Sequence, residues 1–187
     1  MDAFGYLSVL LSIIIGLGVT QLLTGLGRVI RHRDRVRVDW LPLLWTIVLL
    51  VVFVQVWWSM FGLRRQNEWS FGAFLLVLAQ TCGLYLMAAV LLPEQVDTDS
   101  VDLAAHYDRQ HRWFFSFLVA TLIISLMKDR VINGQFPGGA NLGFHAVMLA
   151  LSLSSIFISQ RRYQEFSGIA GAGIIATYIA LLFPRLQ

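Results

Sequence analysis

Six long apolar runs, almost free of charge, constrain the fold of this chain more than any other feature of its sequence. About 20 apolar residues in a helix cross the ~30 Å hydrocarbon core of a bilayer, at roughly 1.5 Å per residue. Five of the runs approach that length, and the only charged residue inside any of them is Glu165, at the edge of the last. The sequence therefore predicts an all-α integral membrane helical bundle with about six transmembrane helices, in a single domain over residues 1–187. The runs cover residues 4–27, 40–62, 71–92, 113–127, 142–160 and 165–183.

Composition and charge support a membrane location over a nucleic-acid partner. Hydrophobic residues make up 57% of the chain, and the mean hydropathy of +0.69 would burden a soluble domain with apolar surface. The net charge of +3 comes largely from a basic loop directly after the first run. Basic loops beside a span are attracted to anionic lipid headgroups. We therefore expect headgroup contacts, and no nucleic acid, at Arg31, Arg33, Arg35 and Arg37.

The distribution of basic residues predicts the orientation of the chain. If the N-terminus is outside, the inward loops carry nine of the 14 Lys and Arg residues and the outward segments carry five. Cytoplasmic loops hold the excess of basic residues in multi-pass proteins. Both termini are therefore predicted to lie outside, on the side that is the periplasm in a bacterial inner membrane. The fourth run is the weakest span, because only 15 uncharged residues lie between Trp113 and Met127.

Three glutamines are the most polar side chains within the runs: Gln21, Gln55 and Gln80. An unsatisfied amide in hydrocarbon costs several kcal/mol, so these side chains are expected to point into the bundle. Two interpretations remain open, hydrogen-bonded contacts between helices or a neutral polar lining for a small solute. Because the runs lack an interior Asp, Glu, Lys or Arg, any solute path is expected to be lined by neutral dipoles.

Two of the runs carry small residues at every fourth position, which places them on one face of a helix. Small side chains let helix backbones approach closely, and this drives helix association in lipid. The contact could lie within one subunit or between the subunits of a homo-oligomer. The ladders consist of Ser8, Ser12, Gly16, Thr20 and Thr24 in the first run and of Gly168, Ala172 and Ala176 in the sixth.

The longest linker, residues 94–111, offers the only other candidate chemistry. Its second half is expected to form a helix that continues into the fourth run, with Asp99 or Ser100 as the N-cap. Asp102, His106 and His111 could hold a metal, but their spacing is not specific for one. We identify no catalytic residue, no cofactor site and no assigned metal site.

Two stretches resemble uncharacterised multi-pass bacterial membrane proteins: the run SIIIGLGVTQLLTGLGR at residues 12–28 and WWSMFGL at residues 57–63. The resemblance implies a bacterial inner membrane and no particular activity. Two functions are therefore expected from the residues. The first is a small passive channel or facilitator with a neutral polar lining that uses the three glutamines. The alternative is a non-catalytic membrane scaffold or accessory subunit that packs through its small-residue faces.

Overall fold

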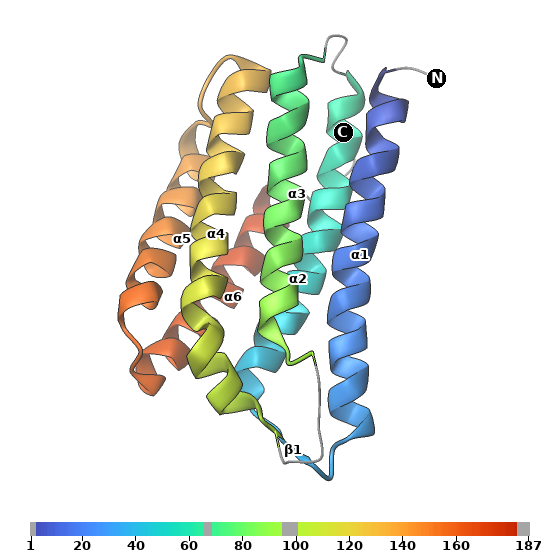
Figure 1. Cartoon of the computed structure of the whole chain (residues 1–187). Helices are drawn as coiled ribbons and strands as arrows, with labels where there is room; N and C mark the ends of the chain where they lie inside the picture. Colours follow the sequence, from blue (N-terminus) through green and yellow to red (C-terminus); the bar gives the residue numbers. More distant parts are fainter. Residues whose placement is uncertain (1–2, 66–68, 95–100, 183–187) are drawn as a thin grey trace.

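Six α-helices run alternately up and down a single bundle, as the computed structural model shows (Figure 1). The structure describes residues 3–65, 69–94 and 101–182. Helix α1 begins, and helix α6 ends, at the same end of the bundle, which we call the terminal end. The helices are α1 (Ala3–Arg31), α2 (Trp40–Ser59), α3 (Phe71–Leu91), α4 (Leu103–Asn133), α5 (Gly139–Phe157) and α6 (Arg161–Leu182).

Two short strands lie at the opposite end, which we call the strand end. Strand β1 (Val36–Arg37) follows α1, and strand β2 (Val101–Asp102) precedes α4. They pair in parallel, with Val36 opposite Val101 and Arg37 opposite Asp102. The pairing joins the first connection to the third and holds the starts of α2 and α4 together.

The all-α class is confirmed, and four helices are long and apolar enough to cross a membrane. They are contained in the segments Phe4–Arg31, Trp40–Arg64, Phe71–Leu91 and Gly139–Phe157. The prediction of six spans extends beyond this result, because α4 and α6 carry charged residues near their ends. Both run beside the other helices in Figure 1. Their insertion as the fourth and sixth spans stays a prediction.

The ends of the helices differ from the apolar runs where polar residues cap or extend a helix. Asp102 caps α4, and its Oδ1 accepts bonds from the backbone N–H groups of Ala104 and Ala105 at 2.8 and 3.2 Å. The predicted caps, Asp99 and Ser100, lie outside the described residues. As expected, α4 continues without a break from the linker into the fourth run. It extends six residues beyond that run to Asn133, where Gly134 (φ 70°) ends it in the left-handed conformation that glycine favours.

An aromatic cluster fills the bundle between its middle and the strand end. The ring centroid of Trp45 lies 5.0 Å from that of Phe114 and 5.7 Å from that of Phe115. All three side chains are buried, as is Phe53 about two turns further along α2. Such pairs bury large apolar areas in preferred tilted and edge-on arrangements.

The small-residue ladder of α1 does not pack inside the subunit. Ser12, Gly16, Thr20 and Thr24 are all exposed, and no other described element comes within 4 Å of a Cβ built on Gly16. The close approach uses the neighbouring stripe instead, where a Cβ on Gly18 would meet the ring of Phe53. The prediction that this ladder packs within one subunit is therefore wrong. Ser8 is the one member that is half-buried. Its use between subunits stays a prediction.

In α6, part of the predicted ladder forms a close helix contact. A Cβ on Gly168 would lie 2.5 Å from Leu41 Cδ1, and one on Gly171 would lie 2.8 Å from the ring of Trp45. Ala172 is half-buried against the core, whereas Ala176 is exposed. The backbones of α2 and α6 thus meet toward the strand end, because glycine leaves room for the large side chains of α2.

Candidate solute-binding cavity

A cavity of about 370 Å³ lies between α2, α3, α4, α5 and α6 in the half of the bundle nearest the terminal end. Gln55 of α2 and Gln80 of α3 both line it, so the fold brings two of the three predicted glutamines to one space. Gln21 lies half-buried on α1 and is not part of the lining. Gly62 and Leu63 also line the cavity, which therefore reaches the connection that follows α2.

The chemistry of the lining differs from one side to the other. Helices α4 and α5 supply Lys128, Asp129 and His145, together with hydroxyl and amide side chains. The wall formed by α2 and α6 is largely aliphatic apart from Gln55, Ser59 and Tyr178. Ligand pockets are commonly apolar with a few convergent polar groups and have volumes of roughly 300–1,000 Å³. This cavity has those features at the small end of the range. The aliphatic side chains of its second wall are Val52, Val56, Ile174, Ile175 and Ile179.

A charged pair lies at the cavity wall, contrary to the expected neutral lining. Lys128 Nζ and Asp129 Oδ1 are 4.0 Å apart, and the two side chains are only 18% and 20% exposed. Neighbouring residues on a helix do not face each other, and 4.0 Å is too long for a hydrogen bond. The two opposite charges balance each other without a direct hydrogen bond. Each group can therefore still form hydrogen bonds with a ligand. The pair was not predicted from the sequence, because the fourth apolar run ends at Met127 whereas the helix continues to Asn133.

His145 joins α4 to α5 beside this pair. Its Nδ1 lies 2.9 Å from the carbonyl oxygen of Asn141, and its Nε2 lies 3.3 Å from Ser125 Oγ. Nδ1 can donate to the carbonyl oxygen, and the Ser125 hydroxyl can either donate to Nε2 or accept from it. The edge of its ring meets Tyr178 of α6 at a centroid distance of 6.1 Å. The imidazole is thus fixed in place between three helices at the cavity wall.

The cavity ends where the aromatic cluster begins. Leu118 and Met148 line its inner part. Leu118 lies one helical turn from Phe114 and Phe115 on the side toward the terminal end. A Cβ built on Gly171 of α6, which would meet the ring of Trp45, would also lie 3.5 Å from Met148 Cε. In this conformation the cavity is therefore closed toward the strand end by packed apolar side chains.

Beyond the aromatic cluster, buried hydrogen bonds join three helices at the strand end. Gln164, 1% exposed, accepts a bond from the hydroxyl of Tyr107 at 3.0 Å. Its amide nitrogen donates to the carbonyl oxygens of Ser155 and Ile158 at 2.9 and 2.7 Å. The last carbonyls of a helix lack partners within it, so Gln164 of α6 caps the end of α5. This glutamine lies between two apolar runs, so hydropathy did not mark it as a buried group.

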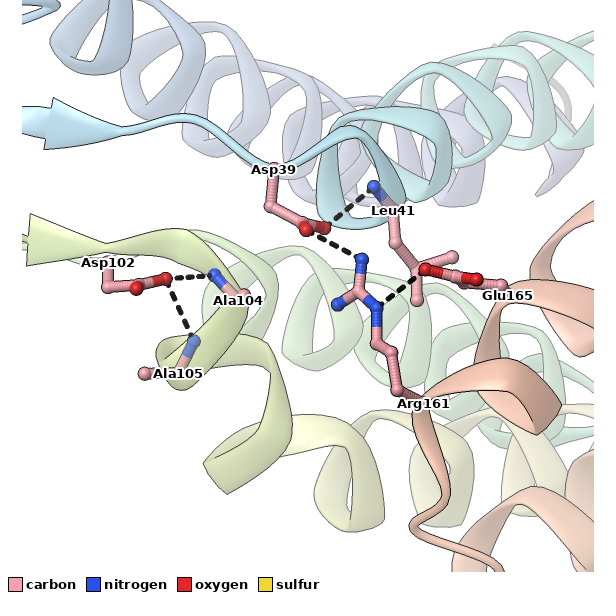
Figure 2. Close-up of polar contacts among 7 residues, drawn as sticks. All are labelled: Asp39, Leu41, Asp102, Ala104, Ala105, Arg161 and Glu165. Carbon is pink, nitrogen blue, oxygen red and sulfur yellow. Dashed lines mark hydrogen bonds and ion pairs between the residues drawn. The ribbon is translucent and has the colours of Figure 1, made fainter.

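A second polar group at the strand end connects α2 to α6 (Figure 2). Asp39 accepts a bond from the backbone N–H of Leu41 at 2.9 Å and one from Arg161 Nη2 at 2.6 Å. Arg161 also donates from Nε to Glu165 at 2.8 Å. One carboxylate thus caps α2 and holds the first turn of α6 against it. This ion pair and the Tyr107–Gln164 bond fix the closed end of the bundle.

The residues considered for a metal site serve other roles. Asp102 caps α4, and His106 Nε2 lies 3.1 Å from the carbonyl oxygen of Val90. His111 contacts the carbonyl oxygen of Asp108 through Nδ1 and Ser159 Oγ through Nε2. Within residues 3–65, 69–94 and 101–182, no three His, Cys, Asp or Glu side chains gather as metal ligands. These contacts are structural.

The arginines predicted to meet lipid headgroups lie at the strand end. Arg31, Arg33, Arg35 and Arg37 are exposed around β1, and the side chain of Arg37 is 84% exposed although it pairs with Asp102 at 3.7 Å. Their contact with anionic headgroups stays a prediction. Comparison with protein-family models, with curated proteins and with solved structures found no match for this chain.

Proposed function

We propose that this membrane protein is a facilitator that takes up a small solute in the cavity at its terminal end and passes it through the bundle. The observation that carries the proposal is the convergence of Gln55 and Gln80 on one 370 Å³ cavity. They come from different helices and meet the charged pair of α4 at the same space. A hydrogen bond between amides of two helices needs no open space around it. This cavity has the volume of about a dozen waters, at roughly 30 Å³ each.

A gated path fits this arrangement better than an open channel. The cavity reaches one end of the bundle, whereas Trp45, Phe114 and Phe115 fill the core toward the other end. Solute passage would therefore require α2 and α6 to move apart at the strand end. The ion pair of Asp39 with Arg161 holds these helices together there. The proposal thus keeps the passive facilitator predicted from the sequence. It differs in that the bundle must move and the lining is partly charged.

The test is solute flux in liposomes that contain the purified protein or one of three single variants. Gln55→Leu and Gln80→Leu remove hydrogen-bonding groups from the cavity at similar side-chain size. Gln21→Leu is the matched control, because it makes the same change at a half-buried glutamine outside the lining. We expect flux to fall roughly tenfold in the first two variants, as losing about 1.4 kcal/mol of hydrogen bonding would give. Equal flux in all three variants would place the path elsewhere.

The alternative proposal is a scaffold or accessory subunit, and the exposed ladder of α1 favours it. Ser12, Gly16, Thr20 and Thr24 form a small-residue face that the rest of the chain, as far as the structure describes it, leaves exposed. In a bilayer such a face lets a second helix approach closely. Liposomes sealed to every solute, together with an oligomer that Gly16→Leu dissociates, would support the scaffold and contradict the facilitator.

A further inference from the structure

A shallow apolar groove lies beside the cavity on the outer surface of the bundle. It has a volume of about 140 Å³ and is formed by Val51, Val54, Gln55 and Trp58 of α2 with Ile179 of α6. Gln55 and Ile179 line the cavity as well. Val51 and Val54 are 45% and 61% exposed, on a face that a bilayer would cover. The cavity thus has a second boundary, toward lipid, in addition to its reach toward the terminal end.

The spacing between α2 and α6 explains why the groove lies at this position. Toward the strand end, Gly168 and Gly171 let the two helices pack closely against Leu41 and Trp45. Toward the terminal end, α6 presents isoleucines in place of glycine, and the cavity lies between the helices. Close packing at one end and larger side chains at the other leave a lateral gap lined by aliphatic groups. The aliphatic lining of such a gap suits an acyl chain.

The polar groups that a ligand in this gap would meet carry one charge of each sign. Lys128 and Asp129 lie on α4, across the cavity from the aliphatic wall. A buried charge needs an opposite partner, and a ligand with one net charge would leave one member of the pair without a partner. A molecule that carries one phosphate and one ammonium matches both groups. The 370 Å³ cavity has the size of a headgroup, so hydrocarbon chains would extend through the groove into the bilayer.

We propose that the solute of this cavity is a zwitterionic lipid that enters sideways between α2 and α6. Its phosphate lies at Lys128, its ammonium lies at Asp129, and one acyl chain follows the groove past Val54 and Trp58. This inference rests on the proposed function, because it names the class of solute for the same cavity. The amphipathic walls support a lipid over a soluble polar solute, which would be better matched by polar groups on every side.

The test uses phosphatidylethanolamine with a photoactivatable diazirine on one acyl chain, added in limiting amount to the purified protein in detergent. Crosslinked peptides are mapped by mass spectrometry, with unlabelled phosphatidylethanolamine, diacylglycerol and soluble phosphoethanolamine as competitors. We expect saturable labelling of the segment 51–58, competed by unlabelled phosphatidylethanolamine about tenfold better than by diacylglycerol or phosphoethanolamine. A tenfold preference corresponds to about 1.4 kcal/mol.

Matched variants separate the site from general lipid contact. Val54→Trp fills the groove, whereas Ile47→Trp makes a similar change two turns away on α2 at an equally exposed position, 60% against 61%. Lys128→Gln removes the cation from the cavity wall, whereas Arg130→Gln removes an exposed one that does not line it. Labelling should fall about tenfold in the first member of each pair and stay within twofold in the second, with unchanged melting temperatures showing that each variant is folded.

Three outcomes would overturn the inference: labelling that does not saturate, labelling equal in all four variants, or competition by phosphoethanolamine as strong as by the whole lipid. The result is independent of the flux test. Solute flux that depends on Gln55 without lipid labelling would leave the facilitator in place and remove the lipid. Saturable labelling in liposomes sealed to solutes and lipids would keep the lipid site and remove the facilitator.

Discussion

Removing one hydroxyl at the strand end tests whether the closed half of the bundle is held by buried hydrogen bonds. In Tyr107→Phe the ring keeps its place beside His111, at a centroid distance of 6.2 Å, while Gln164 loses the bond to its Oε1. Both side chains are buried, at 2% and 1% exposed, so water cannot replace the missing donor without opening the core. A buried acceptor left without a partner costs about 1–3 kcal/mol.

The larger change, Gln164→Met, removes all three of its hydrogen bonds at similar shape. At about 1 kcal/mol per bond, we expect a loss of roughly 3 kcal/mol in the free energy of unfolding. Because Tyr107 and Gln164 share one of these bonds, the double variant should be more stable than the sum of the two single effects predicts, by about 1 kcal/mol. Gln164→Met also leaves the carbonyl oxygens of Ser155 and Ile158, at the end of α5, without the donor that Gln164 supplies.

The assay is thermal unfolding in detergent micelles, followed by circular dichroism. For a chain of this size, each kcal/mol corresponds to roughly 2–4 °C in melting temperature. Tyr6→Phe is the matched control, since it makes the same change at a side chain that is 71% exposed and should leave the melting temperature unchanged. An unchanged melting temperature in Tyr107→Phe, with additive effects in the double variant, would refute the argument that this network is dry and closed.

Three further predictions concern packing, pH and orientation. Gly18→Ala should lower stability by about 1–3 kcal/mol through overpacking, whereas Gly16→Ala should change it little, and equal melting temperatures would contradict this helix contact. Burial lowers the pKa of His106 below its ordinary 6.5, so the unfolded chain binds the proton more readily. Stability should therefore fall as pH drops below about 6.5, and His106→Gln should flatten that dependence. In intact spheroplasts of a cysteine-free variant, an impermeant thiol reagent should label Phe136→Cys and not Arg35→Cys, and the reverse pattern would invert the topology.

The predicted elements agreed with the structure where the signal was local. The apolar runs located every helix, because a segment surrounded by hydrocarbon must satisfy its backbone hydrogen bonds internally and forms a helix. The ends agreed less well. Helix α6 begins at Arg161, four residues before its run, and α4 continues past Met127 to Asn133. Polar residues can extend a helix beyond its apolar part, and hydropathy alone does not register that extension.

The candidate site was predictable only in part. Gln55 and Gln80 were identified as inward polar groups because an amide is costly in lipid, and both line the cavity. Their convergence with Lys128 and Asp129 was not predictable, since the four residues lie on three helices and the two charged ones lie outside the uncharged runs. Gln164 was missed for a similar reason, because its role depends on the end of α5 lying beside it.

That this chain forms apolar helices fit for a membrane follows from its sequence, because length and hydrophobicity are properties of one segment at a time. Which face of each helix turns inward depends on how the helices pack together. Helix α1 is uncharged from Ala3 to Gly27 and carries two stripes of small residues, yet Gly18 faces the core and Gly16 faces outward. In a bilayer, lipid is as apolar as the interior, so hydrophobicity does not select between the two faces. The choice depends on the shapes of the neighbouring helices, here the ring of Phe53 that fits against Gly18.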